Sequence, residues 1–259
     1  MSEARATVAS LAERLGAHVV DSSSSSVDHP ISSVTHDSRR VQPGGLFCCV
    51  VGRHADGHDH AADAVSAGAA ALLVERALDP ANLGADVPQL VVDDVRASMA
   101  HAAVEVYGRP GDRLRTVAVT GTNGKTTVVS TIAHVLRSAG RHVAAIGTLT
   151  GARTTPEATD LQAELAGLVA DGVTDVAMEV SSHALALHRV DGMVFDVAVF
   201  TNLGEDHLDF HGSPEAYFAA KAMLFEPGRS RRGVIDVDDV HGRLLVDAAH
   251  ADQQMVAVT

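Results

Sequence analysis

A glycine-rich loop between a predicted strand and a predicted helix constrains the fold of this 259-residue chain most strongly. The buried strand is expected at Arg115–Val119 and the helix at Thr126–Ser138. Glycines allow positive φ angles and close approach of the backbone, and the N–H groups at the start of a helix attract anions. The strand–loop–helix order therefore predicts a phosphate-binding loop. Its residues are Gly121, Thr122, Asn123, Gly124, Lys125, Thr126 and Thr127.

Two side chains of this loop have expected roles toward a nucleotide. Lys125 is expected to reach the outer phosphates, and the hydroxyl of Thr126 is placed to ligate Mg²⁺. The glycine spacing is one residue tighter than in the common G-x-x-x-x-G-K pattern, unless position 119 replaces the first glycine. A glycine-rich turn that binds nothing is the alternative interpretation.

Strand and helix patterns alternate after this loop, which predicts a doubly wound, mostly parallel sheet. Strands are expected at His142–Ile146, Asp175–Met178, Phe195–Phe200, Gly233–Val237 and Met255–Val258. Helices are expected at Ala158–Ala170, Pro214–Phe225 and Val240–Ala249. The chain stops just after a strand pattern, so we expect this domain to be incomplete at its C-terminus.

The first part of the chain is predicted to be a separate, small α/β domain. The Arg-Pro-Gly-Asp run at 109–112 breaks both periodicities and is a plausible linker, giving expected domains of 1–110 and 111–259. Helices are expected at 6–17, 61–67 and 95–107, and strands at 31–34, 46–51, 71–74 and 89–92. The adjacent Cys48 and Cys49 lie in a strand pattern, which favours buried apolar residues over a disulfide or a metal pair.

Charge and hydropathy exclude several classes of partner. A formal net charge of −13 argues against binding a nucleic-acid backbone. The chain has no basic and apolar leader and no apolar run near about 18 residues, so neither secretion nor membrane insertion is indicated. We therefore expect a cytoplasmic protein.

Further chemistry-bearing residues follow the strands of the second domain. Glu179 ends a predicted buried strand, at the sheet edge where ligands of open α/β sheets bind, and its carboxylate suits Mg²⁺. His207 follows the next strand, and Lys221 lies on a helix beyond it; Lys125 and Lys221 are the only two lysines. An ammonium repels a metal ion, but a lysine carbamylated by CO₂ is an oxygen ligand. A lysine that only forms ion pairs is the alternative.

Five ordered motifs together resemble the Mur ligase family. They are Thr120–Thr127, Met178–Leu185, Thr201–Leu203, Asp206–Gly212 and Tyr217–Lys221. The runs 37–39, 51–57 and 154–157 are similar to nucleotide-sugar contacts of the branch that adds the third amino acid of the peptidoglycan stem. The resemblance implies that ATP phosphorylates the terminal carboxylate of a UDP-N-acetylmuramoyl-dipeptide, and that the amine of an amino acid then attacks the acyl phosphate.

The resemblance also implies a role for each motif residue. Lys125, Glu179, His207 and Lys221 would be catalytic. Thr126 and Glu179 would hold one Mg²⁺, and Glu179, His207 and carbamylated Lys221 a second. Ser38 would contact the uridine end of the substrate. The path of the diphosphate, muramoyl and peptide groups would be lined by Thr154, Thr155, Ser181 and Arg189.

Three departures from the family pattern affect these expectations. The stretch between Ile146 and Thr154 is short, Glu205 stands where arginine or a polar residue is common, and the third, C-terminal domain of the family is expected to be missing. Two alternatives to an active ligase therefore stay open. One is a non-catalytic module that binds a nucleotide or a UDP-sugar, with the C-terminal domain supplied elsewhere. The other is a different P-loop enzyme, such as a kinase or another carboxylate–amine ligase.

Overall fold

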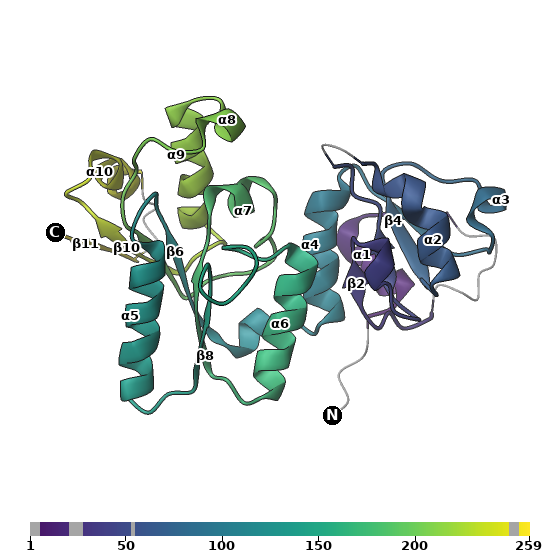
Figure 1. The fold of residues 1–259 in the computed structure, drawn as a ribbon, viewed down its shortest axis with the longest axis horizontal. Helices are drawn as coiled ribbons and strands as arrows, with labels where there is room; N and C mark the ends of the chain where they lie inside the picture. Colours follow the sequence, from purple (N-terminus) through teal and green to yellow (C-terminus); the bar gives the residue numbers. More distant parts are fainter. Residues whose placement is uncertain (1–5, 21–27, 53–54, 249–253) are drawn as a thin grey trace. The chain divides into compact units, whose positions relative to one another are not determined.

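The computed structural model describes residues 6–20, 28–52, 55–248 and 254–259 (Figure 1). The chain divides into two compact units, and the division falls between Arg109 and Pro110. The segment Ala158–Ala163 groups with the first unit, which the sequence did not indicate. In the described part of the chain, no helix is long and apolar enough to cross a membrane.

The first unit is built on a five-stranded sheet of order β1-β5-β4-β3-β2. Only β1, at one edge, runs antiparallel to its neighbour. The strands are β1 His18–Val20, β2 Val34–Thr35, β3 Leu46–Cys48, β4 Ala71–Val74 and β5 Gln89–Val91. The helices are α1 Val8–Leu15, α2 Ala61–Ser66, α3 Pro80–Leu83 and α4 Val95–Val106.

Alternating side chains of the central strands give this unit two apolar cores, one on each face of its sheet. Leu46 and Leu73 belong to a cluster that includes residues of α1 and α4, whereas Phe47 and Leu72 belong to one that includes residues of α2. Successive residues of a strand point to opposite faces, so a sheet covered by helices on both faces needs uninterrupted apolar strands. Cys48 and Cys49 are both fully buried with free thiols, as predicted.

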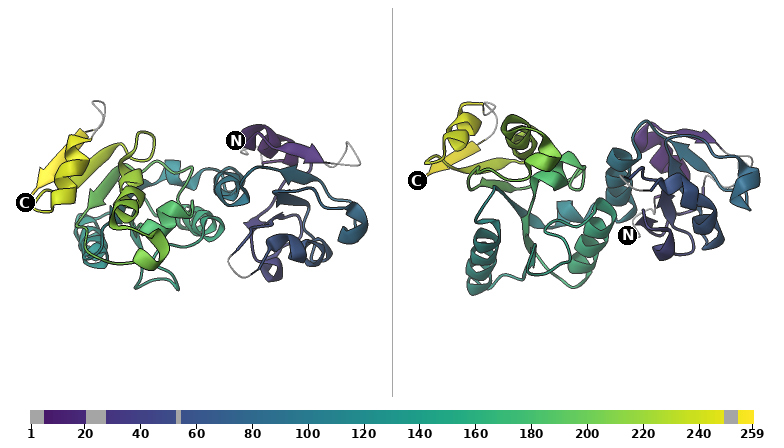
Figure 2. Two further views of the ribbon diagram at one scale, coloured as in Figure 1. Left: turned by 90° about the horizontal axis from the view of Figure 1, so that it is seen from above. Right: turned by 45° about the horizontal axis from the view of Figure 1, so that its top comes forward.

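The second unit contains a six-stranded, entirely parallel sheet of order β11-β10-β9-β6-β8-β7. The strands are β6 Arg115–Thr120, β7 Val143–Ile146, β8 Asp175–Glu179, β9 Val197–Phe200, β10 Arg232–Asp236 and β11 Gln254–Val258. The helices are α5 Lys125–Ser138, α7 Ser182–Ala186, α8 Leu208–His211, α9 Pro214–Ala222 and α10 Val240–Asp247, together with the part of α6 (Ala158–Ala170) that follows Ala163. Figure 2 shows α10 and β11 at the outer end of this sheet.

These elements confirm the predicted fold class, an α/β unit followed by a parallel sheet with crossover helices. The differences are local. The strand expected at 31–34 is only the two residues of β2, and β1 and α3 were not predicted. The helix expected at Pro214–Phe225 changes at Met223 to a 3₁₀ turn, and the last residue of the helix expected at 240–249 lies outside the described residues.

The strand order places a topological switch point at the end of β6. Its neighbours β8 and β9 lie on opposite sides, and Val119 is in register with Glu179 while Thr120 is in register with Phe200. All three strands therefore end at one edge of the sheet. In open α/β sheets, the crevice at such a point binds ligands.

A buried valine and an exposed valine of the first unit allow the contribution of the apolar core to stability to be tested. Val74 on β4 is fully buried, whereas Val51 is 48% exposed. We expect Val74→Ala to lower the free energy of unfolding by about 2 kcal/mol, because it removes buried methyl groups and leaves a cavity. Val51→Ala should change it by less than about 0.5 kcal/mol. Urea unfolding of both variants checks this, and equal losses would contradict the assigned core.

Candidate active site

The loop that joins β6 to α5 is held by hydrogen bonds to the residues that follow β9. Thr122 N donates to the Asn202 carbonyl (2.9 Å), and Asn123 N donates to Asn202 Oδ1 (2.9 Å). Gly121 has φ +146°, and a Cβ there would lie 1.9 Å from Thr201 Oγ1. Only glycine fits so close an approach. The loop is thus held in shape by residues of the Thr201–Leu203 motif.

The N-terminus of α5 is open to a ligand. Its N-cap is Gly124, at φ +85°, which offers no side chain to the first N–H groups of the helix. A Cβ built on Gly124 would have no described atom from outside the neighbouring residues within 4 Å. N–H groups at the start of a helix attract anions, so this end of the 14-residue helix suits the phosphate group that the loop is expected to bind.

Both lysines of the chain donate to one carbonyl oxygen of this loop. Lys125 Nζ lies 2.9 Å from the Gly121 and Thr122 carbonyls, and Lys221 Nζ lies 2.9 Å from the Gly121 carbonyl. Lys221 is 1% exposed, and its burial together with the positive charge of Lys125 lowers its pKa to about 7. Burial also lowers the pKa of Lys125. The amine of Lys221 is therefore readily deprotonated.

Tyr217 connects Lys221 to the phosphate loop. Its ring lies 4.3 Å below Lys221 Nζ, and its hydroxyl lies 3.1 Å from Thr122 Oγ1. Tyr217 is 1% exposed and lies on α9, one turn before the lysine. Tyr217 begins the Tyr217–Lys221 motif, but no role was expected for it, although its spacing of four residues from Lys221 on one helix face was a signal.

Glu179 is a buried carboxylate, 1% exposed, at the end of β8. Its Oε1 accepts from Thr126 Oγ1 (3.0 Å) and Thr148 N (2.9 Å), and its Oε2 from Thr148 Oγ1 (3.3 Å). A Cβ on Gly147 would lie 2.3 Å from Oε1, so any larger residue there would push the carboxylate out of this position. The structure thus brings Thr126 and Glu179 together as predicted, and their hard oxygen atoms fit one Mg²⁺.

His207 belongs to a group of aromatic rings after β9. Its ring contacts His183 edge-on (centroids 4.6 Å apart) and lies 6.2 Å from Tyr217, and its φ of +54° is unusual for a non-glycine residue. His211 Nε2 lies 2.9 Å from Ser182 Oγ, which ties α8 to α7. Burial, followed by the neighbouring His207, lowers the pKa of His183.

The predicted second metal set is not assembled by direct contacts. Lys221 Nζ donates a hydrogen bond to the Gly121 carbonyl, and His207 Nε2 lies 3.4 Å from Asp206 Oδ2. Across the described residues, no three His, Cys, Asp or Glu side chains are arranged to hold a metal ion. The set of Glu179, His207 and Lys221 therefore stays a prediction.

Four predicted substrate residues lie around the end of β8. Thr154 Oγ1 is 3.1 Å from Thr148 Oγ1, and Thr155 Oγ1 donates to the Glu179 carbonyl (2.9 Å). Ser181 N donates to Thr155 Oγ1 (3.1 Å), and Arg189 donates to the Thr155 carbonyl (3.2 Å). Arg189 also pairs with the buried Glu157 (2.8 Å). Thr154, Ser181 and Arg189 are partly exposed beside the strand end that carries Glu179, whereas Thr155 is fully buried and connects them through its hydrogen bonds.

Ser38 lies in the first unit, in the 3₁₀ helix Ser38–Arg40. Asp37 caps this helix, and its hydrogen bond with Arg39 lowers the Asp37 pKa to about 2. A hollow of about 350 Å³ beside the helix is lined by residues that include Thr35, Arg39, Arg40 and Tyr107. Of the 51–57 run, residues 53 and 54 lie outside the described residues.

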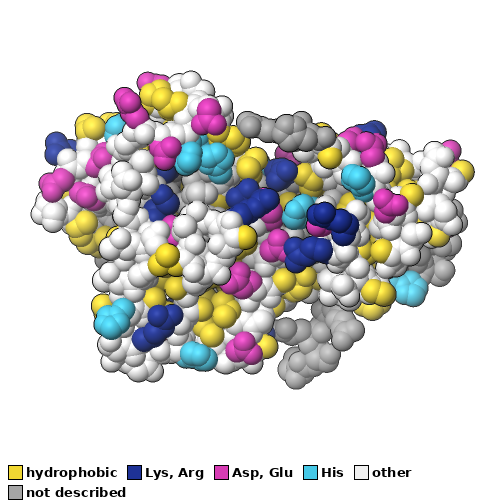
Figure 3. Space-filling model, viewed as in Figure 1, with side chains coloured by type: hydrophobic (Ala, Val, Ile, Leu, Met, Phe, Trp, Pro, Cys, Tyr) yellow, Lys and Arg dark blue, Asp and Glu magenta, His cyan; other side chains and the backbone are white. Residues whose placement is uncertain are grey.

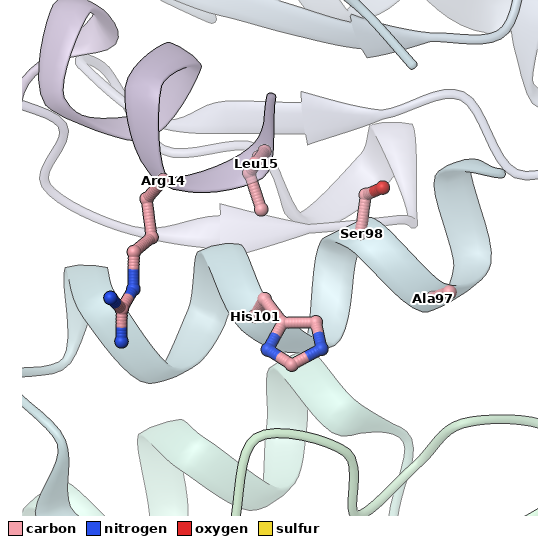
Figure 4. A pocket seen from close by; sticks show the side chains of 5 residues that line it. All are labelled: Arg14, Leu15, Ala97, Ser98 and His101. Atoms are coloured by element: carbon pink, nitrogen blue, oxygen red, sulfur yellow. The ribbon is translucent and has the colours of Figure 1, made fainter. Parts of the chain in front are cut away.

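A second hollow of the first unit, between α1 and α4, has a volume of about 330 Å³ (Figure 4). Its lining includes Arg14, Ser98 and His101. The Arg14 guanidinium is paired with Glu105 at 3.0 Å, so its charge is already compensated. This hollow has no counterpart among the motifs of the sequence.

Acidic side chains are numerous on the surface of the second unit that carries α8, α9 and α10 (Figure 3). This surface repels anions, so phosphate groups must be attracted locally. The N–H groups at the start of α5 and the Lys125 ammonium are the positive groups suited to that attraction.

Comparison with known proteins identifies the family of both units. Residues 119–259 match the Mur ligase middle domain, and residues 30–107 match the Mur ligase family catalytic domain. The chain is 46% identical over 251 residues to the UDP-N-acetylmuramoyl-L-alanyl-D-glutamate–2,6-diaminopimelate ligase of Streptomyces coelicolor, covering 93% of this chain and 48% of that protein. It is 48% identical over 204 residues to the ligase of the same name from Geobacillus kaustophilus, covering 75% and 41%.

Solved structures give the same result. The structure of a UDP-N-acetylmuramoyl-L-alanyl-D-glutamate–2,6-diaminopimelate ligase superposes with a TM-score of 0.79 at 31% identity, covering 97% of this chain and 52% of that one. A MurF ligase from Thermotoga maritima in complex with ADP shares the fold, with a TM-score of 0.59 at 20% identity over 87% of this chain and 49% of that one.

The fold, the phosphate loop and the matched domains define a P-loop ligase architecture. The chain belongs to the Mur ligase family, which confirms the resemblance of its motifs. It spans about half the length of the curated relatives it matches.

The contact between Gly147 and Glu179 predicts a specific cost of substitution. Gly147→Ala must displace the Glu179 carboxylate from Thr126 and Thr148, and hydrogen bonds to a buried charge are expensive to lose. We expect the free energy of unfolding to fall by about 2 kcal/mol. Gly151→Ala is the control, because its Cβ would meet no atom closer than 3.4 Å. Equal unfolding midpoints in urea for the two variants would contradict this geometry.

Proposed function

We propose that this chain carries the ATP site and the nucleotide-sugar site of a ligase in peptidoglycan synthesis. The ligase would add an amino acid to UDP-N-acetylmuramoyl-dipeptide. The observation that carries the proposal is one sheet edge where Lys125, Thr126 and Glu179 lie beside Thr155 and Ser181. The proposed phosphate site and the proposed substrate site therefore both adjoin the end of β8, where Glu179 lies.

The ATP phosphates would bind over the phosphate loop. Lys125 would exchange its two backbone carbonyl partners for phosphate oxygens, and the open N-terminus of α5 would donate N–H groups. Thr126 and Glu179 would hold Mg²⁺, which neutralises phosphate charge during phosphoryl transfer when bound. Catalysis here is positioning and electrostatic stabilisation rather than covalent chemistry by the protein.

The substrate carboxylate would lie on the side of Thr154, Thr155, Ser181 and Arg189. A carboxylate oxygen attacks the γ-phosphorus and ADP leaves, which gives an acyl phosphate. The amine nitrogen of the amino acid then attacks the acyl carbon. The tetrahedral intermediate expels phosphate, and the nitrogen loses its proton to leave an amide. Arg189 would line this side of the site, where the substrate charge would compete with Glu157 for its guanidinium.

The second metal set and its carbamate are part of the same proposal. A carbamate on Lys221 would place an anionic oxygen ligand near Glu179 and His207, the predicted second Mg²⁺ site. The buried position of Lys221 keeps competing water away from its nitrogen. Ser38 would contact the uridine end of the substrate in the first unit.

The relatives also bear on the amino acid and on the compartment. The Streptomyces and Geobacillus proteins are named as 2,6-diaminopimelate ligases, which favours diaminopimelate as the incoming amino acid. UDP-sugars are cytoplasmic metabolites, so we place the protein in the cytoplasm. Because the chain spans half the length of these relatives, a module that binds both ligands without turnover is the second candidate.

Binding of ATP depends on Lys125 in this account. Titration calorimetry should show saturable binding of Mg·ATP and of UDP-N-acetylmuramoyl-dipeptide to the wild-type chain. Lys125→Ala should weaken ATP binding by about 100-fold, because the ammonium pairs directly with phosphate charge. Arg137→Ala, at the other end of α5, is the control and should bind ATP normally. A folded wild-type chain that binds neither ligand would refute the proposal.

The carbamate on Lys221 can be detected directly. In buffer containing ¹³C-labelled bicarbonate, the wild-type chain should show a carbamate carbon resonance by NMR, and Lys221→Gln should not. The remaining lysine, Lys125, serves as the internal control, because it is present in both samples. A spectrum without this resonance in the wild type would remove Lys221 from the proposed metal ligands.

A further inference from the structure

Thr148 contacts both halves of the candidate site, yet no motif includes it. It follows β7 in the turn Gly147–Gly151. Its backbone N–H donates to Glu179 Oε1 (2.9 Å), and its hydroxyl lies 3.3 Å from Glu179 Oε2 and 3.1 Å from Thr154 Oγ1. One residue therefore joins the carboxylate of the proposed metal site to the substrate side.

The direction of these hydrogen bonds follows from the chemistry of the groups. An ionised carboxylate only accepts, so the single hydroxyl proton of Thr148 is donated to Glu179. The hydroxyl of Thr154 must then donate to Thr148. Thr154 is left with lone pairs, and it meets a ligand as an acceptor of an N–H or O–H group.

The turn that presents Thr148 is shaped by other contacts. Thr150 Oγ1 accepts from Gly147 N (2.9 Å) and donates to the Gly147 carbonyl (3.1 Å). Thr150 has no bond to Glu179 among the described residues. The shape of the turn and the orientation of the carboxylate thus depend on two different threonines.

We propose that Thr148 is a positioning residue that orients Glu179 for Mg²⁺ and links it to Thr154 on the substrate side. This inference rests on the proposed function, because it assumes that Glu179 holds the metal. Thr148 donates one hydrogen bond to each oxygen of the Glu179 carboxylate. These two bonds hold the carboxylate in the orientation in which Oε1 also contacts Thr126 Oγ1. Groups that hold a metal-binding carboxylate in this way tune the affinity for the metal.

The test is a Mg²⁺ titration of the full chain at a fixed ATP concentration, followed by calorimetry. Thr148→Val removes the hydroxyl but keeps the backbone N–H, and it should weaken Mg²⁺-dependent ATP binding by about ten-fold. Thr148→Ser restores the hydroxyl and should bind Mg²⁺ nearly as the wild type does. Thr150→Val, which alters only bonds within the turn, is the matched control and should also retain wild-type Mg²⁺ dependence.

The possible outcomes are distinct. If the wild type binds Mg·ATP and Thr148→Val has the same Mg²⁺ dependence, the inference is wrong while the proposed function stands. Equal weakening in Thr148→Val and Thr150→Val would also overturn it, because the shape of the turn would then be the cause. If the wild type shows no Mg·ATP binding, the proposed function itself fails. Thr148 is exposed, so the valine variant should fold, and its unfolding midpoint checks this.

Discussion

The arrangement of the second unit depends on keeping one carboxylate charged inside the protein. Glu179 is almost completely buried, and a buried carboxylate is stable only when donors replace the water it has lost. Thr126 of the phosphate loop and Thr148 of the turn after β7 supply those donors. The backbone carbonyl of Glu179 in turn accepts from Thr155. Glu179 therefore connects the phosphate loop, the turn after β7 and the segment around Thr155 through hydrogen bonds.

The phosphate loop shows the opposite electrostatic situation. Two ammonium groups, those of Lys125 and Lys221, donate to the Gly121 carbonyl, and the repulsion between them contributes to the lowered pKa of Lys221. An anion over the loop would draw Lys125 away from this carbonyl and relieve the repulsion. The positive charge is thus concentrated where phosphates are expected, in a unit that carries many acidic side chains on the surface around α8, α9 and α10.

Much of this architecture could be predicted from local patterns. The apolar runs gave the parallel strands, and the rule that parallel strands end together brought Glu179 close to Thr126 before any contact was known. The antiparallel edge strand β1 was missed because three residues carry too little periodicity. The short helix α3, with its proline start, was missed for the same reason.

The parts of the site that escaped prediction depend on contacts across the chain. Thr148 follows β7, so its position at a strand end was a signal, but its bond to Glu179 spans 31 residues. The left-handed backbone of His207 and the packing of His183 against it follow from three-dimensional packing rather than from any spacing. Of these residues, only His207 was expected to be a metal ligand, and it was expected through the family resemblance. The contacts of Thr148, His183 and His207 could be known only from the three-dimensional structure.

The central claim, that Thr126 and Glu179 form a metal site beside the phosphate loop, is tested most directly by anomalous diffraction. Crystals of the chain would be grown with Mn²⁺, which also prefers oxygen ligands, and a non-hydrolysable ATP analogue. The account predicts an anomalous peak bound by Thr126 Oγ1 and a Glu179 carboxylate oxygen, with Lys125 on the phosphates. Phosphates bound away from the 121–127 loop, or a Mn²⁺ peak that does not touch Glu179, would contradict it.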